Sequence, residues 1–397
     1  MSGHSRSATA HPGYSPTGSP GSGKQQPRRV TPYGTSAWST ASWGVGPQRK
    51  TGTARNGRRC RRVLRTMTTT QQAGGASPVD FAAFGDYGDF RRKQPQPATG
   101  EFVRPAYPFR GRVTADGSSG YPAVAGRYHL YISWACPWAH RTAIVRKLLG
   151  LQEAISLSAV DPVRDGRGWA FREGPGYSLD PVNGFSLLRE AYEATEPGYD
   201  GHISVPVLWD RETGRIVSNN FPGITIDLDT QFGAFSNGTD LYPQALRPEI
   251  DAINAVVYET VNNGVYRSGM ATSQEAYHDA VSKVFATLDD LEQRLAGRRY
   301  LLGDAITEAD VRLWVTLARF DAVYHYHFKV NLRRLTDYPN LWGYARDLYS
   351  LPAFRDTTNF DHIKRHYYTT HPHINPTRII PDGPLLDWAA PHDRALS

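Results

Sequence analysis

The stretch GRYHLYISWACPWAHRTAIVRKLLG, residues 126–150, predicts a strand that is followed at once by a helix. In its first half Tyr128, Leu130 and Ile132 alternate with other residues, which is the two-residue period of a strand. Its second half repeats apolar residues at one-turn spacing, with Pro137 at the start and Gly150 at the end, as in a helix. Cys136 therefore falls at the junction of strand and helix.

The segments that follow extend this pair into a larger unit. EAISLSAV, residues 153–160, predicts a second strand, so that the first three elements form a parallel, right-handed βαβ unit. After a polar insertion over residues 161–201, HISVPVLWD (202–210) and GRIVSNN (214–220) predict a hairpin. A helix is expected to begin at residues 220–222. This order is typical of a thioredoxin-type α/β domain.

Beyond about residue 241 the sequence changes to helical spacing. Four stretches, within residues 247–266, 273–296, 307–328 and 340–351, repeat apolar residues at helical intervals. Thr307 and Asp310 stand three residues apart before an apolar run, a variant of the capping box and a folding signal rather than a catalytic one. The tail from residue 352 is rich in Pro, His and Tyr, and we expect it to lie over the surface as ordered loop.

The charge of the chain is unevenly distributed. The formal net charge is +7, but residues 1–66 carry twelve Lys and Arg and no acid, which leaves 33 basic against 38 acidic groups elsewhere. A fold-wide nucleic-acid footprint needs a basic face on the folded part, and this distribution argues against one. No run approaches the roughly 18 apolar residues of a membrane span, so no membrane partner is predicted.

The first 78 residues are predicted to be a disordered basic leader, because their first 66 are rich in Gly, Ser, Pro, Thr and Arg without apolar periodicity. Three interpretations are open: an organelle transit peptide, a basic tail for nucleic acid or anionic lipid, and a start assigned too early, with Met67 as the first residue. We favour the last, and the cytoplasm as location. Residues 79–238, 239–355 and 356–397 then form the thioredoxin-like domain, a helical domain and an ordered tail.

The two cysteines exclude a disulfide framework, since Cys60 lies in the leader and Cys136 is alone in the folded part. No Cys/His cluster has zinc spacing, so no metal is predicted. Cys136 is either buried filler or a nucleophile. The N-terminus of a helix stabilises a thiolate and lowers the thiol pKa, and His140 and Arg141 are expected to add positive charge, so we favour the nucleophile.

Other candidates depend on context. Pro206 interrupts a strand, which fits an edge, a bulge or a cis bond that leaves the Val205 backbone free to pair with a peptide-like ligand. Tyr266 and Tyr324 are either core residues or hydrogen-bond donors to a developing oxyanion. Trp169 in the insertion either tethers a loop or forms part of a site.

Several of these segments together resemble the glutathionyl-hydroquinone reductases, the Xi class of the glutathione transferase superfamily. The resemblance covers about residues 80–385 and is carried by SWACPWAHR (133–141), VPVLWD (205–210), NNGVYRSG (262–269), the run from residue 301 to 349 that contains RFDAVYHYHF, and HIKRHYYTTHPHINPTRIIPDGP (362–384). It implies an α/β thioredoxin-like domain followed by an all-α glutathione transferase C-terminal domain, and a homodimer.

The resemblance also implies the chemistry. Cys136 would be the nucleophile, Tyr266 and Tyr324 would line the quinone pocket, Trp169 would close over the thiol, and Val205–Pro206 would pair with its cysteinyl backbone. The substrate would be a thioether-conjugated hydroquinone. Cys136 would attack its sulfur and form a mixed disulfide, which a second small thiol would resolve.

One element departs from the family. Where the family has a Glu–Ser pair that binds the γ-glutamyl end of glutathione, this chain has Asn220 and Phe221. Losing two contacts to charged groups, worth roughly 1.5–3 kcal/mol each, would weaken glutathione several hundredfold or more. Three accounts are open: weak use of glutathione through backbone contacts at the helix N-terminus, a lapsed enzyme, or another thiol. Mycothiol, an N-acetylated cysteine on a sugar–inositol unit, would suit the altered site.

Two alternatives to this function stay open: a non-catalytic interaction protein and a general thiol–disulfide oxidoreductase of the same fold. The cysteine at a helix start, together with Tyr266 and Tyr324, argues against a purely non-catalytic role.

Overall fold

The computed structural model describes residues 74–82 and 97–394, all within the unit Thr69–Ser397. Residues 1–73 of the predicted leader, with Cys60 and Met67, lie outside the described residues, whereas residues 74–78 are described and the Ala76 N–H donates to the Phe171 carbonyl at 3.1 Å. In the part that is described, no helix is long and apolar enough to cross a membrane.

A four-stranded mixed sheet forms the first half of the described chain. Its strands are β1 (Tyr128–Ile132), β2 (Ile155–Ala159), β3 (Val207–Asp210) and β4 (Arg215–Ser218), in the order β2-β1-β3-β4. β1 pairs with β2 in parallel and with β3 antiparallel, and β3 pairs antiparallel with β4. The βαβ unit and the hairpin predicted from the sequence are thus confirmed, and with them the thioredoxin-like order.

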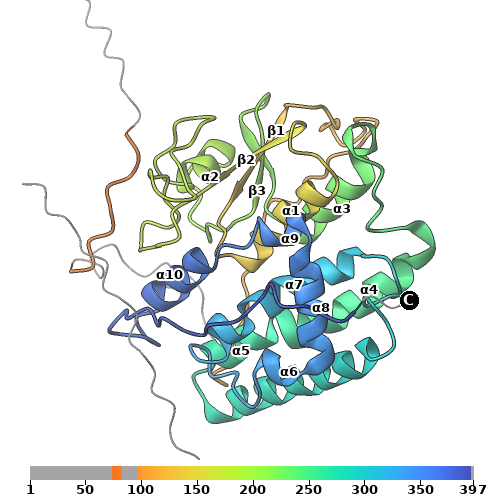
Figure 1. The fold of residues 1–397 in the computed structure, drawn as a ribbon. Coiled ribbons are helices and arrows are strands. Elements are labelled where there is room, and N and C mark those ends of the chain that lie inside the picture. Colours follow the sequence, from red (N-terminus) through yellow and green to blue (C-terminus); the bar gives the residue numbers. More distant parts are fainter. Residues whose placement is uncertain (1–73, 83–96, 395–397) are drawn as a thin grey trace, which may run out of the picture. The chain divides into compact units, whose positions relative to one another are not determined.

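Three helices accompany the sheet: α1 (Pro137–Leu148), α2 (Arg189–Thr195) and α3 (Phe221–Gln231). α1 and α3 pack against each other, and α1 also contacts α7 (Glu308–Arg319) of the second half. Figure 1 draws α1 and α3 between the sheet and the second half, and α2 on the other side of the sheet. The polar insertion is therefore not loop alone, because it contains α2, which buries Tyr192.

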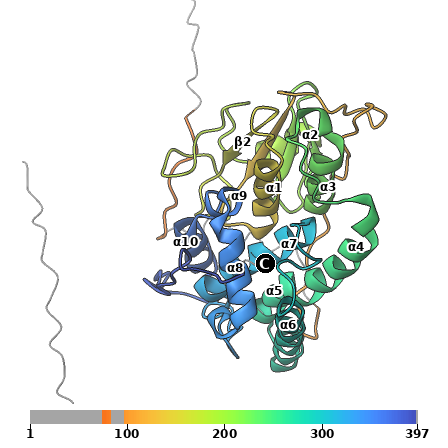
Figure 2. The same ribbon diagram turned by 45° about the vertical axis from the view of Figure 1, so that its right-hand side comes forward.

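The second half is helical, as predicted. Besides α7 its helices are α4 (Arg247–Val256), α5 (Gly264–Met270), α6 (Gln274–Leu295), α8 (Pro339–Ser350), α9 (Pro352–Arg355) and α10 (Phe360–Thr370). Two π-helical segments, Val257–Asn262 and Phe320–Tyr324, precede α5 and follow α7. Figures 1 and 2 both show α6 at the edge farthest from the sheet.

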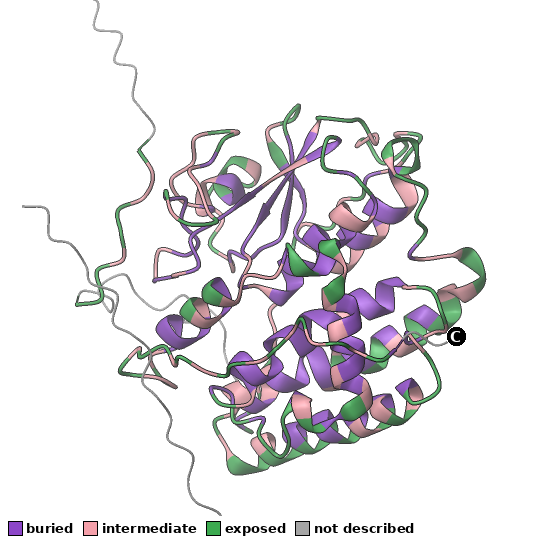
Figure 3. Ribbon diagram, in the orientation of Figure 1, coloured by how far each residue is buried: buried purple, intermediate pink, exposed green. Residues whose placement is uncertain are grey.

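The core follows the amphipathic pattern of these elements. All five residues of β1 are buried, and Figure 3 shows buried stripes on the inner faces of the helices and an exposed outer face on α6. The predicted capping box of α7 is present: the backbone N–H and hydroxyl of Thr307 both donate to Asp310, at 2.8 and 2.9 Å. Asp310 also accepts hydrogen bonds from the Leu301 N–H and the Tyr344 hydroxyl.

The expectation of a loop-like tail is wrong over residues 352–370. α9 and α10 occupy this part, and α10 buries Ile363, Tyr367 and Tyr368. The segment after α10 is irregular, as predicted. α10 becomes important for function because it forms one wall of the pocket described next.

Candidate active site

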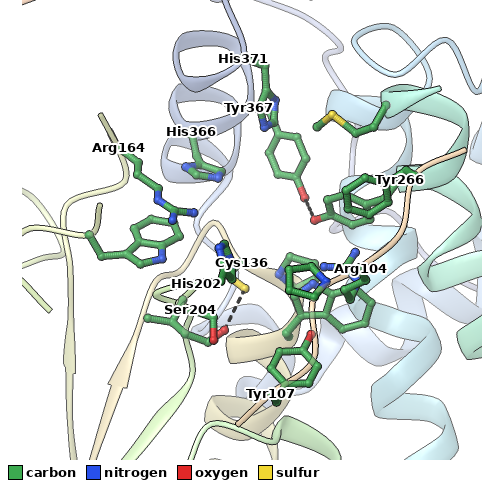
Figure 4. A pocket seen from close by; sticks show the side chains of 17 residues that line it. Arg104, Tyr107, Cys136, Arg164, His202, Ser204, Tyr266, His366, Tyr367 and His371 are labelled. Atoms are coloured by element: carbon green, nitrogen blue, oxygen red, sulfur yellow. Dashed lines mark hydrogen bonds between the residues drawn. The ribbon is translucent and has the colours of Figure 1, made fainter. Parts of the chain in front are cut away.

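A pocket opens where the start of α1 faces the helical half (Figure 4). Its walls come from segments that are far apart in the sequence. These are an irregular segment before β1, residues 101–110, which we call the strap, then the start of α1, the insertion, the residues just before β3, α5 and α10. The residues that line it are Phe102, Arg104, Pro105, Tyr107, Cys136, Pro137, Trp138, Arg164, Trp169, His202, Ser204, Val205, Tyr266, Met270, His366, Tyr367 and His371.

Cys136 is the residue that caps the N-terminus of α1. Its backbone is extended, with φ −79° and ψ 120°, and Pro137 follows in the first turn, where a missing N–H costs nothing. The side chain is half-buried and its thiol donates to the Val205 carbonyl at 3.5 Å. The N–H groups of Ala139 and Trp138 point to the sulfur. The sulfur atom therefore stands at the positive end of a twelve-residue helix and in the pocket.

The predicted lowering of the Cys136 pKa is wrong for this site. Burial by the pocket walls raises the pKa of the thiol, and it outweighs the opposite effect of the two N–H groups and of the guanidinium groups of Arg319 and Arg104. His140 adds no positive charge, because burial lowers its pKa well below the usual range and its Nδ1 accepts from Arg319 at 3.1 Å. Arg141 has a pKa lowered to about 9 by burial and stays charged at neutral pH.

Arg319, at the C-terminus of α7, fixes the turn that carries Cys136. Its guanidinium donates to the carbonyls of Ala135 at 3.0 Å and Trp134 at 2.9 Å. The side chain is fully buried. A residue of the helical half thus holds the backbone of the strand-to-helix junction, a role that the sequence alone did not indicate.

The Val205–Pro206 bond is cis, which is one of the three alternatives that the sequence leaves open for this proline. Val205 lines the pocket next to Cys136, while Pro206 is buried behind it. The Val205 backbone therefore lies beside the Cys136 sulfur in the pocket wall.

Trp169 lies in the pocket wall, so the insertion does more than tether a loop. Its ring stacks on His366 of α10, with 5.0 Å between centroids and 21° between planes, and the Arg164 guanidinium lies 5.0 Å from its centroid. His366 donates from Nδ1 to the Pro162 carbonyl at 2.8 Å, since a carbonyl can only accept. Burial lowers the pKa of His366 to about 3, so the ring is neutral. The insertion and α10 are therefore joined at the pocket mouth.

The two tyrosines expected at the pocket take different places in the structure. Tyr266 lines the pocket, but Tyr324 does not, and Tyr367 of α10 takes that place. The Tyr367 hydroxyl lies between the hydroxyls of Tyr266, in a very short contact, and Tyr324, at 3.0 Å. Burial raises the pKa of all three, so each keeps its proton. The sequence does not indicate Tyr367 as a pocket residue, because the tail from residue 352 is predicted to be surface loop, whereas Tyr367 lies in α10.

Asn220 and Phe221 lie at the start of α3 and are not among the residues that line the described pocket. Asn220 is the helix-capping residue, half-buried, without a side-chain cap. Phe221 is fully buried, and its ring packs 4.8 Å from Trp138 and 5.4 Å from Tyr107, both of which line the pocket. The Arg141 guanidinium carbon lies beside both rings, 4.8 Å from the centroid of Phe221 and 4.8 Å from that of Trp138. Phe221 thus backs the pocket wall with an apolar ring.

The N-terminus of α3 is poor in free donors. The Asn220 N–H already donates to the Ser218 hydroxyl at 3.1 Å, and Pro222, in the first turn, has no N–H. Among the described residues, no group of three or more His, Cys, Asp or Glu could hold a metal ion.

The chain is similar to known proteins over most of its described length. A family model for the glutathione S-transferase C-terminal domain matches residues 274–347. The glutathionyl-hydroquinone reductase YqjG of Escherichia coli is 49% identical over 303 residues, which cover 74% of this chain and 92% of that protein. The glutathionyl-hydroquinone reductase PcpF of Sphingobium chlorophenolicum is 49% identical over 288 residues, covering 72% and 90%.

Solved structures agree with this assignment. The glutathione-bound structure of YqjG has a TM-score of 0.71 at 49% identity, covering 74% of this chain and 97% of that one. A glutathione transferase from Gordonia bronchialis has a TM-score of 0.71 at 52% identity, covering 73% and 90%. The chain therefore belongs to the glutathionyl-hydroquinone reductases, the Xi-class enzymes of the glutathione transferase superfamily.

Proposed function

We propose that the protein cleaves thioether-conjugated hydroquinones reductively, with Cys136 as nucleophile and a small thiol as co-substrate. The observation that carries the proposal is the position of the Cys136 sulfur. It stands at the start of α1, beside the Val205 backbone, in a pocket whose wall includes the hydroxyl-bearing rings of Tyr266 and Tyr367. The names and sequences of YqjG and PcpF support the same reaction.

The first step would consume the conjugate. The Cys136 thiolate attacks the conjugate's sulfur, a sulfur–sulfur bond forms, and the bond from sulfur to ring carbon breaks. The electron pair of that bond passes into the ring, so a protonated Tyr266 or Tyr367 is needed to deliver a proton to the ring carbon. The hydroquinone leaves, and Cys136 remains in a mixed disulfide with the small thiol.

The second step would restore the enzyme. A second small thiol, as thiolate, attacks the sulfur of the first, and Cys136 leaves as a thiolate. In sum the conjugate is reduced by two electrons and two small thiols are oxidised to a disulfide. Trp169 and the Val205 backbone flank the sulfur and would hold the bound thiol during both steps.

We further propose mycothiol rather than glutathione as the small thiol. Phe221 stands at the position of the family serine, whose hydroxyl would donate to the γ-glutamyl carboxylate, and Asn220 replaces the glutamate whose carboxylate would bind the ammonium. Pro222 and the engaged Asn220 N–H leave few backbone donors to compensate. A neutral thiol whose cysteine is acylated needs neither contact, and the aromatic wall of Tyr107, Trp138 and Trp169 offers flat faces to a sugar.

The test offers the purified protein glutathionyl-menadiol and mycothiyl-menadiol, each with its own free thiol, and follows release of menadiol. We expect a kcat/KM for the mycothiol pair at least tenfold higher. Equal or better turnover with glutathione would contradict the proposal that mycothiol is the small thiol, but it would leave the proposed reaction class unaffected. No release from either conjugate would contradict the reaction class itself.

The role of Cys136 is tested by Cys136→Ala, with circular dichroism as a check of folding. We expect loss of hydroquinone release, and mass spectrometry should find the mixed disulfide on the wild-type protein alone. Full activity of the variant would overturn the mechanism. A protein that exchanges simple disulfides but leaves the carbon–sulfur bond intact would be a general thiol–disulfide oxidoreductase, and one that does neither would be an interaction protein.

The proposal includes a homodimer located in the cytoplasm. The family resemblance supports the dimer. Multi-angle light scattering of the purified chain measures its mass in solution, and a monomeric mass across the micromolar range would contradict this part of the proposal.

A further inference from the structure

Arg104 lies in the pocket, although the strap that carries it has no regular secondary structure. Its guanidinium carbon lies 4.4 Å from the centroid of the Trp138 ring and 4.7 Å from that of Tyr266. Figure 4 shows it on the side of Cys136 toward Tyr266. Arg104 therefore lies against two neighbouring rings: Trp138, close in sequence to the nucleophile, and Tyr266, which would line the site of the aromatic group.

The hydrogen bonds of this guanidinium are incomplete. Nε donates to the Asn263 side chain at 2.7 Å, whereas Nη2 is buried and has no protein partner among the described residues. A buried donor without a partner destabilises the folded protein, and a charged donor does so more strongly. Such a group is retained where a ligand completes its hydrogen bonds.

The charge of Arg104 is also uncompensated in the pocket. No carboxylate is among the described residues that line it. Burial favours loss of the Arg104 proton, but the surrounding Tyr107, Tyr266 and Tyr258 and the Cys136 sulfur outweigh this and raise its pKa. Arg104 is thus a permanent cation that packs against two neighbouring rings and has one N–H group without a protein partner among the described residues.

We propose that Arg104 is a catalytic residue that binds the ring oxygen on which negative charge develops as the carbon–sulfur bond breaks. This proposal rests on the proposed function. In the keto tautomer of the conjugate, the electron pair released by the carbon–sulfur bond passes through the adjacent ring carbon to the carbonyl oxygen and forms an enolate. Arg104 binds that oxygen. The enolate is the phenolate of the hydroquinone, because in the keto tautomer the ring carbon that bore the sulfur already carries a hydrogen, and a proton delivered by tyrosine to the oxygen gives the neutral hydroquinone.

The geometry favours this role over two others. If Arg104 only tied the strap to α5, its bond to Asn263 would suffice and Nη2 would not need to lie buried in the pocket. If it only stabilised the Cys136 thiolate, its contact with the Tyr266 ring of α5 would be unnecessary. A donor that is aimed at developing negative charge is worth about 10²–10³ in kcat.

The test compares Arg104→Met and Arg104→Lys with Arg110→Met, a matched control on the same strap. Arg110 is exposed and donates from Nε to the Tyr107 carbonyl, outside the pocket. Each variant is assayed with conjugates of menadiol and of increasingly chlorinated hydroquinones, whose phenols are progressively more acidic. We expect a loss of about 10²-fold in kcat for the menadiol conjugate in Arg104→Met, and a smaller loss for more acidic leaving groups. Arg104→Lys should recover part of the activity, and Arg110→Met should match the wild type.

A second measurement does not require turnover. In the Cys136→Ala background, para-nitrophenol reports the pKa of a bound phenol by its absorbance, and Arg104 should lower that pKa relative to the Arg104→Met form. An equal loss for all conjugates together with an unchanged phenol pKa would overturn the proposal. If the wild type releases no hydroquinone but Arg104 still lowers the pKa of the bound phenol, the proposed function is refuted. Arg104 as the residue that binds an anionic ring oxygen is then retained.

Discussion

Replacing Asn220 and Phe221 by the Glu–Ser pair of the family should change which small thiol the protein uses as co-substrate. We predict that Asn220→Glu combined with Phe221→Ser improves glutathione as co-substrate and destabilises the protein. The first substitution places a carboxylate at the capping position of α3, and the second replaces a fully buried ring by a hydroxyl beside Tyr107 and Trp138. Both new groups would then face the γ-glutamyl end of glutathione.

The magnitudes follow from the contacts that are gained and lost. Two hydrogen bonds to charged groups, at about 1.5–3 kcal/mol each, amount to about 3–6 kcal/mol, or a gain of about 10²- to 10⁴-fold in kcat/KM for glutathione. Removing the Phe221 ring leaves a cavity next to Trp138, Tyr107 and Arg141, which costs about 3–5 kcal/mol of unfolding free energy.

The assay is the ratio of kcat/KM for glutathionyl-menadiol to that for mycothiyl-menadiol, with urea denaturation for stability. Phe221→Leu is the control, because it keeps the site apolar and should leave the ratio unchanged. Asn220→Glu alone should give an intermediate ratio. A ratio that stays constant in the well-folded double variant would refute the assignment of these positions to the γ-glutamyl end.

Three further predictions concern the pocket and its support. Because burial raises the pKa of Cys136, its alkylation by iodoacetamide should still speed up as pH passes about 8.5; levelling off at lower pH would contradict this. Tyr367→Phe should lower kcat about 10²-fold, whereas Tyr324→Phe, which loses one hydrogen bond to Tyr367, should lower it about fivefold; equal losses would place both at the substrate. Asp310→Ala loses four accepted hydrogen bonds, about 4 kcal/mol in urea denaturation, while exposed Asp304→Ala should cost almost nothing.

The elements that could be predicted are those whose signal is local. β1 and α1 follow from the change of hydrophobic period around Cys136, and the α7 start follows from Thr307 and Asp310. α2 was missed because seven residues bury only Ala191 and Tyr192, too little for a periodic pattern. α10 was missed because, apart from Ile363, its buried residues are tyrosines, a histidine and threonines, which do not give an apolar periodic pattern.

The site was predicted in part, for a related reason. Cys136, Trp169, Val205 and Tyr266 stand at the pocket, where spacing or the family resemblance put them. The direction of the Cys136 pKa shift was wrong because the helix start is a local feature, whereas the walls that desolvate the thiol come from distant segments. Which tyrosine reaches the pocket depends on side-chain direction, which the sequence does not contain.

The contact of Arg319 with the backbone before Cys136 has a consequence for how such proteins can change in evolution. The strand-to-helix turn of the first half receives its hydrogen bonds from the last turn of α7 in the second half. Recombination that joined this α/β half to a foreign helical half would leave two carbonyls without donors beside the sulfur, unless the newcomer also carried an arginine at that turn. The two halves are therefore expected to be inherited together.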